Sequence, residues 1–478
     1  ALPPSFPKKQ QHPEKQQHPA EQHHPEKQLV PLPAPPSFRG DKGKGTTSPA
    51  PPPAPPPDSG FTLPAPFGVR QYDRSEGKGF GPVLTDAIRH PSKDVVYVIL
   101  NMMQCKHLDH VPPGMPKRSE HKHGRRLRGR ELLGRGAFSV CKMLWSKTIW
   151  LCRYEGEDRW EAGLVHHNTL DGREGRGGVM VVECPAPRGA ANLSSILSIE
   201  AKSDTAHVTQ PLYKHHNISV KPHDYFGDQQ FEVAACTMVT NQKDVHVLLE
   251  PWVDYHKQLG VEAFLIYVEE TSMTFVRELL AKHLADGRVK LINFWFPDLS
   301  KLRDWRTQWA QEHHCLYWAR GRVRWMAYMD VDEFFDVRGG RSLSDYLASI
   351  DYDKISALEA SSAFWSFGSS EAQGKAFASP GRLPCQLQCH GNQFGHGRRS
   401  KMLWNPEGTL YVTPHHVVVG APGRMVHYAD ANTELRLVHA QLHTNRSMSK
   451  CRASDTSFSH SRICHMRLNS TAAVGPTP

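Results

Sequence analysis

Residues 323–335 read VRWMAYMDVDEFF, and this stretch decides the fold class that we expect. Its first seven residues are mostly apolar, which predicts a buried strand that runs directly into Asp330-Val331-Asp332. Side chains at positions i and i+2 of an extended chain share a face, so both carboxylates can turn toward one ion. Mg²⁺ and Mn²⁺ prefer such oxygen ligands and also bind the oxygens of a diphosphate. The stretch therefore predicts a divalent-metal site at the end of a strand.

The residues before this stretch alternate between strand and helix patterns. The expected strands are 231–240, 261–268 and 288–295, and the expected helices are 245–259, 275–284 and 305–319. This alternation is typical of a parallel sheet with right-handed crossovers. Ligands of such sheets bind at the carboxyl ends of the strands, where Asn241 follows the first strand and the acidic pair follows the fourth. We therefore predict an α/β domain with its site at that edge.

Other interpretations of the acidic pair are weaker. An EF-hand loop needs further oxygen ligands and a glycine at fixed offsets, and Glu333-Phe334-Phe335 removes them. A phosphatase with an aspartyl nucleophile normally has Thr or Val where Phe334 stands. A nucleotidyltransferase would need a phosphate loop after the first strand, but residues 240–244 (TNQKD) contain no glycine. The remaining structural alternative is a carboxylate pair that caps a turn.

The rest of the chain differs in composition. Residues 1–80 are rich in Pro, Gln and His and contain HPEKQ twice, at 12–16 and 24–28, which predicts a disordered stem or linker. Residues 81–228 contain short β-branched runs separated by loops, which predicts a small β-rich accessory domain, for which a sandwich is one possible form. We expect the α/β domain over 229–450 and a C-terminal tail over 451–478.

The net charge of +10 raises the question of nucleic-acid binding. Much of it lies in residues 117–130 (KRSEHKHGRRLRGR), which have no interleaved aromatic residues and no zinc-finger spacing. A solvated loop and no nucleic-acid partner are therefore expected, although an anionic polysaccharide or a membrane surface would suit the charge. The ten cysteines are compatible with one or two disulfides and equally with free thiols.

Asn-X-Ser/Thr sequons at Asn192, Asn217, Asn445 and Asn469 point to a secreted or lumenal setting. No stretch is apolar over the ~20 residues that a membrane-spanning helix needs. The chain begins with Ala rather than Met, so an N-terminal anchor or signal can precede residue 1.

A series of short blocks extends from Ala234 to His439. They are Cys236-Thr237-Met238, Asn241-Gln242, Glu250-Pro251-Trp252, Tyr255-His256, Leu259-Gly260-Val261, Ile266-Tyr267, Gln308, Cys315, 325–335, 365–370 (WSFGSS), Lys401, His415-His416 and His439. Through the order and spacing of these blocks the chain resembles glycosyltransferase family 92, and within it the plant and algal branch that includes the β-1,4-galactan synthases.

The resemblance implies a GT-A fold, a UDP-sugar donor (usually UDP-galactose), Mn²⁺ or Mg²⁺, a glycan acceptor and inversion at the anomeric carbon. Members of the family are usually type II Golgi membrane proteins with a flexible stem, and the predicted stem fits this. The chain has Val268-Glu269-Glu270-Thr271 where the family has Asp-Asn-Asn-Ser, Glu371-Ala372 where it often has Gly-His, and Ala440 where it has Tyr. These departures keep open a catalytically inactive glycan-binding protein of the same fold.

The resemblance also implies roles for individual residues. The expected metal ligands are Asp330, Asp332 and His439, and the expected nucleotide-sugar contacts are Thr237, Asn241, Tyr267, Gln308, Asp330 and Lys401. Glu333 and Glu371 are the candidates for the catalytic base, because inversion needs a carboxylate within reach of the acceptor hydroxyl. Trp365 and Phe367 are the candidates for stacking on acceptor sugars. For His439, Tyr267 and the two aromatic residues, a purely structural role is the alternative.

Overall fold

The computed structural model describes residues 83–101, 148–168, 179–186, 195–203, 213–220, 224–239, 245–294, 305–366, 389–393 and 399–440. The predicted stem and C-terminal tail lie outside these residues, and the predicted domain boundaries stay predictions. Within the described ranges no helix combines the length and the apolar character needed to cross a membrane.

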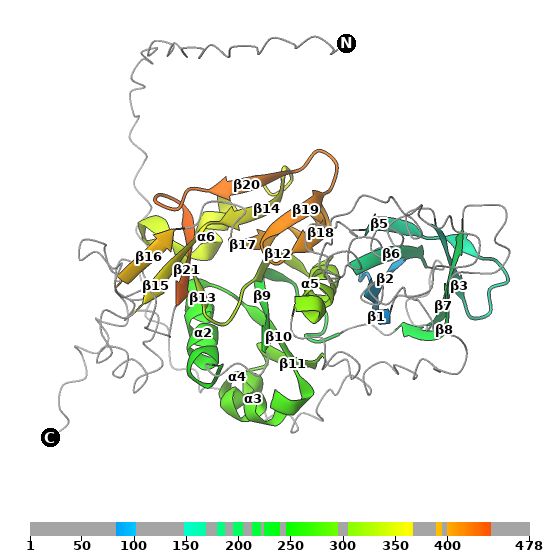
Figure 1. Cartoon of the computed structure of the whole chain (residues 1–478), viewed down its shortest axis with the longest axis horizontal. Coiled ribbons are helices and arrows are strands. Elements are labelled where there is room, and N and C mark those ends of the chain that lie inside the picture. The colour runs from blue at the N-terminus through cyan, green and yellow to red at the C-terminus, as the bar shows by residue number, and fades with distance from the viewer. Residues whose placement is uncertain are drawn as a thin grey trace, which may run out of the picture. The chain divides into compact units, whose positions relative to one another are not determined.

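A seven-stranded sheet forms the centre of the fold, with strand order β11-β10-β9-β12-β17-β14-β20 (Figure 1). The strands are β9 (Phe231–Val239), β10 (Ala263–Val268), β11 (Val289–Asn293), β12 (Val323–Tyr328), β14 (Ile355–Ala360), β17 (Lys401–Trp404) and β20 (Met425–Ala429). The first four are mutually parallel, and β17 runs antiparallel to both of its neighbours. This confirms the predicted mixed α/β fold with a mostly parallel central sheet.

The order of the parallel strands creates a switch point. From β9 the chain adds β10 and then β11 on one side, and it returns to place β12 on the other side of β9. In open α/β sheets the crevice at such a reversal, outside the carboxyl ends of the strands, is where ligands bind. The acidic stretch follows β12 and therefore lies at this position.

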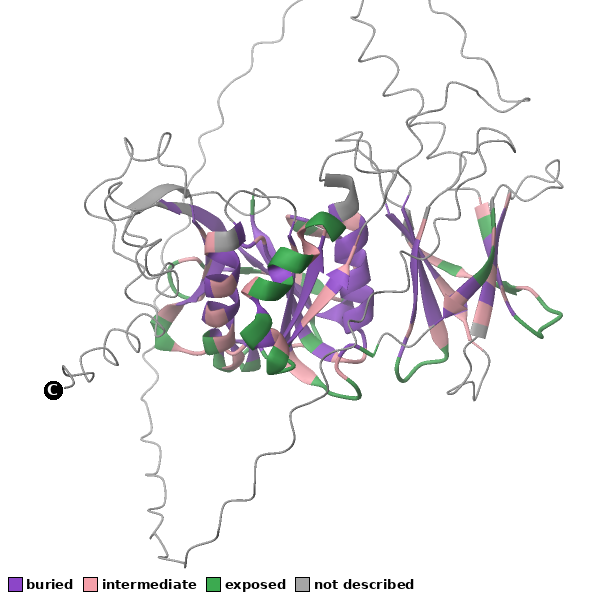
Figure 2. Ribbon diagram, turned by 90° about the horizontal axis from the view of Figure 1, so that it is seen from below, coloured by how far each residue is buried: buried purple, intermediate pink, exposed green. Residues whose placement is uncertain are grey.

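Helices cover both faces of the sheet because the strands alternate their side chains between two cores. Val233 and Ala235 of β9 join one core with α2 (Val245–Leu259) and α3 (Met273–Leu279). Ala234 and Cys236 join the other core with α5 (Trp305–Ala319). Figure 2 shows the strands as mostly buried, with exposed residues gathered on helices and turns.

The helix expected over 275–284 is divided in two. The structure has a 3₁₀ turn (Glu270–Ser272), then α3, then α4 (Ala281–Ala285), and the break lies at Leu280, whose φ of −101° and ψ of 14° leave the helical region. By contrast, α2 and α5 have the predicted bounds. Gly260, with a φ of 111°, ends α2 in a conformation that a side chain would strain.

A second sheet has the order β13-β21-β15-β16. Its strands are β13 (Glu333–Val337), β15 (Ser362–Ser366), β16 (Cys389–Gln393) and β21 (Leu435–Ala440). Because β12 ends at Tyr328 and β13 begins at Glu333, residues 329–332 are the passage from one sheet to the other. The smaller elements are 3₁₀ turns at Arg338–Gly340 (η5) and Pro406–Gly408 (η7), α6 (Leu343–Ala348), and the pair β18 (Thr409–Thr413) and β19 (His416–Gly420).

Two four-stranded sheets precede the α/β part, which confirms the β-rich content predicted for this region. One has the order β1-β2-β6-β5 and the other β4-β3-β7-β8. The strands are β1 (Val83–Arg89), β2 (Val95–Asn101), β3 (Thr148–Tyr154), β4 (Glu161–Ala162), β5 (Leu164–Asn168), β6 (Val179–Pro185), β7 (Ser195–Ser203) and β8 (Tyr213–Val220). One core contains residues of both sheets, and a disulfide between Cys152 and Cys184 joins them. A second disulfide, Cys236–Cys315, joins β9 to α5.

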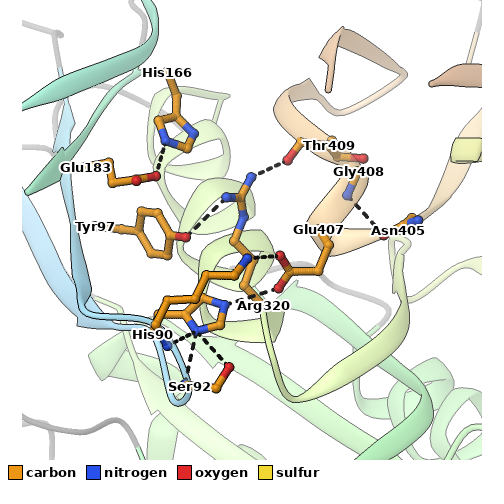
Figure 3. A network of polar contacts seen from close by, with 11 residues as sticks. His90, Ser92, Tyr97, His166, Glu183, Arg320, Asn405, Glu407, Gly408 and Thr409 are labelled. Carbon is orange, nitrogen blue, oxygen red and sulfur yellow. Dashed lines mark hydrogen bonds and ion pairs between the residues drawn. The ribbon is translucent and has the colours of Figure 1, made fainter. Parts of the chain in front are cut away.

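A polar network connects the first of these sheets to the α/β part (Figure 3). Arg320, directly after α5, donates hydrogen bonds to the Thr409 carbonyl (2.6 Å) and to the Tyr97 hydroxyl (3.3 Å). Glu407 of η7 pairs with His90 (3.2 Å) and with Lys93 (2.5 Å). Because these groups come from segments more than 200 residues apart in the sequence, they fix the β-rich sheets against the α/β part.

Candidate functional site

The acidic stretch forms a tight turn between β12 and β13. The backbone N–H of Glu333 donates to the Asp330 carbonyl (3.0 Å), and the N–H of Asp330 donates to Glu333 Oε2 (2.9 Å). The side chains of Asp330 and Asp332 remain 39% and 33% exposed, whereas that of Glu333 is 1% exposed. Two carboxylates are thus open to a ligand, and the third lies behind them.

Lys401 provides a buried positive charge beside this turn. It is the first residue of β17, which pairs with β12, and its Nζ lies 2.8 Å from Asp330 Oδ2 and 3.2 Å from Glu333 Oε2. The ammonium also lies 5.1 Å from the ring centroid of Tyr328. Burial would lower the pKa of Lys401, but the neighbouring Asp330 and Glu333 carboxylates outweigh it and raise the pKa. Lys401 is therefore charged at any physiological pH.

His439 reaches the turn from β21. The register of β13 and β21 places His439 opposite Glu333. Its Nε2 lies 3.0 Å from Asp332 Oδ2, and its Nδ1 lies 3.4 Å from Glu333 Oε1. Burial would lower the pKa of His439, but the charge of Asp332 and the hydrogen bond to it raise the pKa above its usual value. The imidazole thus lies among carboxylates and faces the partly exposed Asp332.

Glu333 differs from the two aspartates in its burial. Burial raises the pKa of Glu333 to about 7, although the charge of Lys401 opposes this shift. A carboxyl group with such a pKa can take up or release a proton near neutral pH. Its Oε2 lies near the Asp330 amide and Lys401, and its Oε1 near His439.

Among the predicted site residues, the structure brings five together: Asp330, Asp332, Glu333, Lys401 and His439. Gln308 lies one contact further away, because its side-chain amide donates to the Tyr328 hydroxyl (2.8 Å) and the Tyr328 ring lies beside Lys401. Thr237 is buried in β9. Asn241, Phe367 and Glu371 lie outside the described residues, and their roles stay predictions.

Tyr267 and Trp365 are placed away from this cluster. The Tyr267 hydroxyl lies 2.6 Å from His314 Nδ1, and His314 Nε2 lies 2.8 Å from Asp86 Oδ2, so Tyr267 belongs to a buried polar chain that runs to β1. Trp365 is 1% exposed, and the Arg436 guanidinium lies 4.8 Å from its ring centroid. Both placements favour the structural alternative over the predicted nucleotide and acceptor contacts.

Sequence reasoning did not select Glu312. This residue of α5 is fully buried, and its pKa is raised well above the usual value by burial, with the charge of Lys401 opposing the shift. Glu312 is therefore a buried carboxyl group whose neutral form is favoured and which interacts with Lys401 and Asp330 of the site. It is the only acidic residue in the α5 sequence WRTQWAQEHHCLYWA. A single acidic residue in an otherwise uncharged part of a helix was the sequence feature that could have pointed to it.

The model of glycosyltransferase family 92 matches residues 229–469, half of the chain. The chain belongs to glycosyltransferase family 92. The match covers α2 to α5, the acidic turn, Lys401 and His439, so the cluster described above lies within the family's own sequence region.

Curated members of the family match parts of the chain. A family 92 protein of Ricinus communis is 32% identical over 119 residues, which are 25% of this chain and 20% of that protein. A second alignment with the same protein is 30% identical over 206 residues, which are 39% of this chain and 31% of that protein. A family 92 protein of Oryza sativa subsp. japonica is 29% identical over 115 residues, which are 24% of this chain and 18% of that protein. Each matched segment thus spans less than a third of its relative.

A solved structure, 4-diphosphocytidyl-2C-methyl-D-erythritol synthase of Anaerococcus prevotii, aligns with 29% of this chain and 57% of its own, at 12% identity and a TM-score of 0.18. A likeness of that extent does not establish a shared fold.

Proposed function

We propose that this family 92 protein is a metal-dependent, inverting glycosyltransferase that moves a hexose, most simply galactose, from a UDP-sugar to a glycan acceptor. The observation that carries the proposal is the meeting of Asp330, Asp332, His439 and Lys401 at the carboxyl end of β12. This position is the switch point of the sheet, where a nucleotide would bind. The GT-A arrangement is part of the same proposal, and the parallel strands β9 to β12 support it.

The residues fit a divalent cation. Asp332 and His439 offer an oxygen and a nitrogen 3.0 Å apart, and the partly exposed Asp330 adds a further carboxylate. Carboxylate and imidazole together suit Mn²⁺, and Mg²⁺ would rely on the carboxylates alone. When bound, the cation would neutralise charge that develops on the leaving UDP.

Lys401 and Glu333 hold this arrangement in place. Lys401 fixes Asp330 by an ion pair, and because its side chain is also only 1% exposed, its positive charge would act on the diphosphate through the field of the site rather than by direct contact. Glu333 accepts a hydrogen bond from the Asp330 amide and lies against His439, so it orients both groups. A base must reach the acceptor hydroxyl, and the 1% exposure of Glu333 favours a positioning role. Glu371 is then the candidate for the base.

The catalytically inactive glycan-binding protein is the second candidate. It is favoured by the departures at 268–271, 371–372 and 440, which lie beside family motifs. The proposed setting is the lumen of the Golgi apparatus, with a membrane anchor N-terminal to the stem. The sequons and the family resemblance support that setting.

The test is turnover of a panel of UDP-sugars by the purified chain with Mn²⁺, with EDTA, and in an Asp332→Ala variant. Release of UDP that requires the metal and disappears in the variant is the expected result, and it identifies the sugar. Binding of a glycan without release of UDP from any donor would instead establish the inactive binding protein.

A further inference from the structure

A second group of candidate metal ligands lies between α2 and α4, on residues that the proposed function does not use. Glu250 and Asp254 are four residues apart on α2 and therefore share one face of the helix. His283 comes from α4. One potential ligand atom from each of the three side chains lies within 4.8 Å of the other two.

His283 is the feature that requires an explanation. Its side chain is 1% exposed, and within the described part of the chain neither of its ring nitrogens has a hydrogen-bond partner. Buried polar groups in folded proteins normally have such partners, because burial without one costs free energy. His283 Nε2 is directed toward Asp254 Oδ1 at 3.6 Å, which is beyond hydrogen-bond range.

This separation suits two atoms that share an ion. Metal–ligand bonds of about 2.1 Å at tetrahedral angles place neighbouring ligand atoms roughly 3.4 Å apart. The two carboxylates are only partly buried, so a cation can enter from solvent, and water can supply the remaining ligand. An imidazole nitrogen with two carboxylate oxygens is a donor set for a transition metal rather than for Ca²⁺ or Mg²⁺.

We propose that Glu250, Asp254 and His283 bind a zinc ion that clamps α2 to α4. This site is separate from the acidic turn and goes beyond the proposed activity. A neighbouring ion pair between Lys257 of α2 and Asp286, directly after α4, ties the same two helices together.

The opposite side of α2 explains what the clamp stabilises. Trp252 Nε1 donates to the Glu333 carbonyl (3.0 Å), and the Tyr255 hydroxyl donates to the Phe335 carbonyl (2.7 Å). At ~100° per residue these two side chains lie across the helix from Glu250 and Asp254. A zinc ion on one side therefore holds the helix that positions the first strand after the acidic turn.

The experiment uses the full chain carrying Asp332→Asn, which removes the proposed catalytic metal site from the count. The chain is stripped with a chelator and dialysed against ZnCl₂, and bound zinc and Tm are measured. Adding Asp254→Asn or His283→Gln is expected to remove one zinc per chain and to abolish the rise in Tm that zinc produces. Adding Glu278→Gln, which removes an exposed carboxylate of α3, is expected to change neither.

Zinc bound by the His-rich N-terminal residues does not affect the difference in zinc content between variants, because all variants share these residues. If His283→Gln prevents folding, the partly exposed Asp254 decides the question through Asp254→Asn. Equal zinc content and equal zinc-dependent Tm in the Asp332→Asn chain with and without Asp254→Asn would overturn the proposal.

Discussion

His439 Nε2 lies 3.0 Å from Asp332 Oδ2, although 107 residues separate them in the sequence. The pairing of β13 with β21 produces this contact, since it places His439 opposite Glu333 at the start of β13. The proposed ligand set is therefore a consequence of strand register: a shift by one residue would turn His439 to the other face of the sheet.

Replacement of His439 tests its proposed role as a metal ligand. We expect His439→Gln to raise the Mn²⁺ concentration needed for half-maximal UDP release by roughly 10–100-fold, with a smaller effect on Tm. The control is His427→Gln, because His427 also pairs with a carboxylate, Glu434, but lies on β20. Equal metal dependence in the two variants would show that His439 is structural.

Lys401 neutralises carboxylates that would otherwise repel one another in a buried setting. We expect Lys401→Met to lower the free energy of unfolding by roughly 3–5 kcal/mol, because it removes the buried cation that pairs with both Asp330 and Glu333. Urea unfolding measures this change. Lys354→Met removes an exposed lysine that pairs with Asp351 and should cost much less, because exposed ion pairs contribute little to stability. A similar small cost for both variants would contradict the buried-charge account.

Glu333→Gln separates positioning from base catalysis. We expect kcat/KM to fall by roughly 10–100-fold, because Asp330 and His439 lose an orienting partner. Because Glu371 is the proposed base, the decline of activity that accompanies falling pH in the wild type should persist in the Glu333→Gln variant. A loss beyond about a thousandfold, together with disappearance of a pH limb near 7, would assign the base to Glu333 instead.

Glu407 couples stability to pH at the contact between the β-rich sheets and the α/β part. Burial alone would raise the pKa of Glu407, but hydrogen bonds from His90 and Lys93 outweigh it and lower the pKa to about 2. A depressed carboxyl pKa adds stability above the unfolded-state pKa, and this stability is lost as pH falls through the folded-state pKa.

We therefore expect Glu407→Gln to cost roughly 1–2 kcal/mol at pH 7, with the difference from wild type closing as pH falls from about 4.5 toward 2. Urea unfolding across this pH range measures the difference. A cost that does not change with pH would mean that Glu407 contributes by packing alone.

The sequence predicted most local elements between residues 231 and 329 well, because each carries its own periodicity, and it made no prediction for the strands after the acidic turn. The helices at 245–259 and 305–319 have the predicted bounds, and the strand before Asp330 ends within a residue of its predicted end. The break at Leu280 was missed, since apolar residues keep helical spacing on both sides of it.

The parts that depend on long-range pairing were beyond sequence reasoning. Nothing near Lys401 indicates that β17 inserts between β12 and β14 and so brings its ammonium to Asp330. Likewise, the face to which Tyr267 points depends on the packing of α5 and β1 against β10. Family resemblance supplied His439 and Lys401 as site residues, and strand register supplies the physical reason why they meet the acidic turn.

Binding of UDP measured by calorimetry, with and without Mn²⁺, tests most directly the claim that the acidic turn holds a metal-bound nucleotide. This measurement needs no knowledge of the sugar or the acceptor. We expect wild-type chain to bind UDP with Mn²⁺ and to bind it at least tenfold more weakly in EDTA, and Asp332→Ala to bind weakly in both. UDP binding of equal strength in EDTA, or in Asp332→Ala with Mn²⁺, would contradict the account.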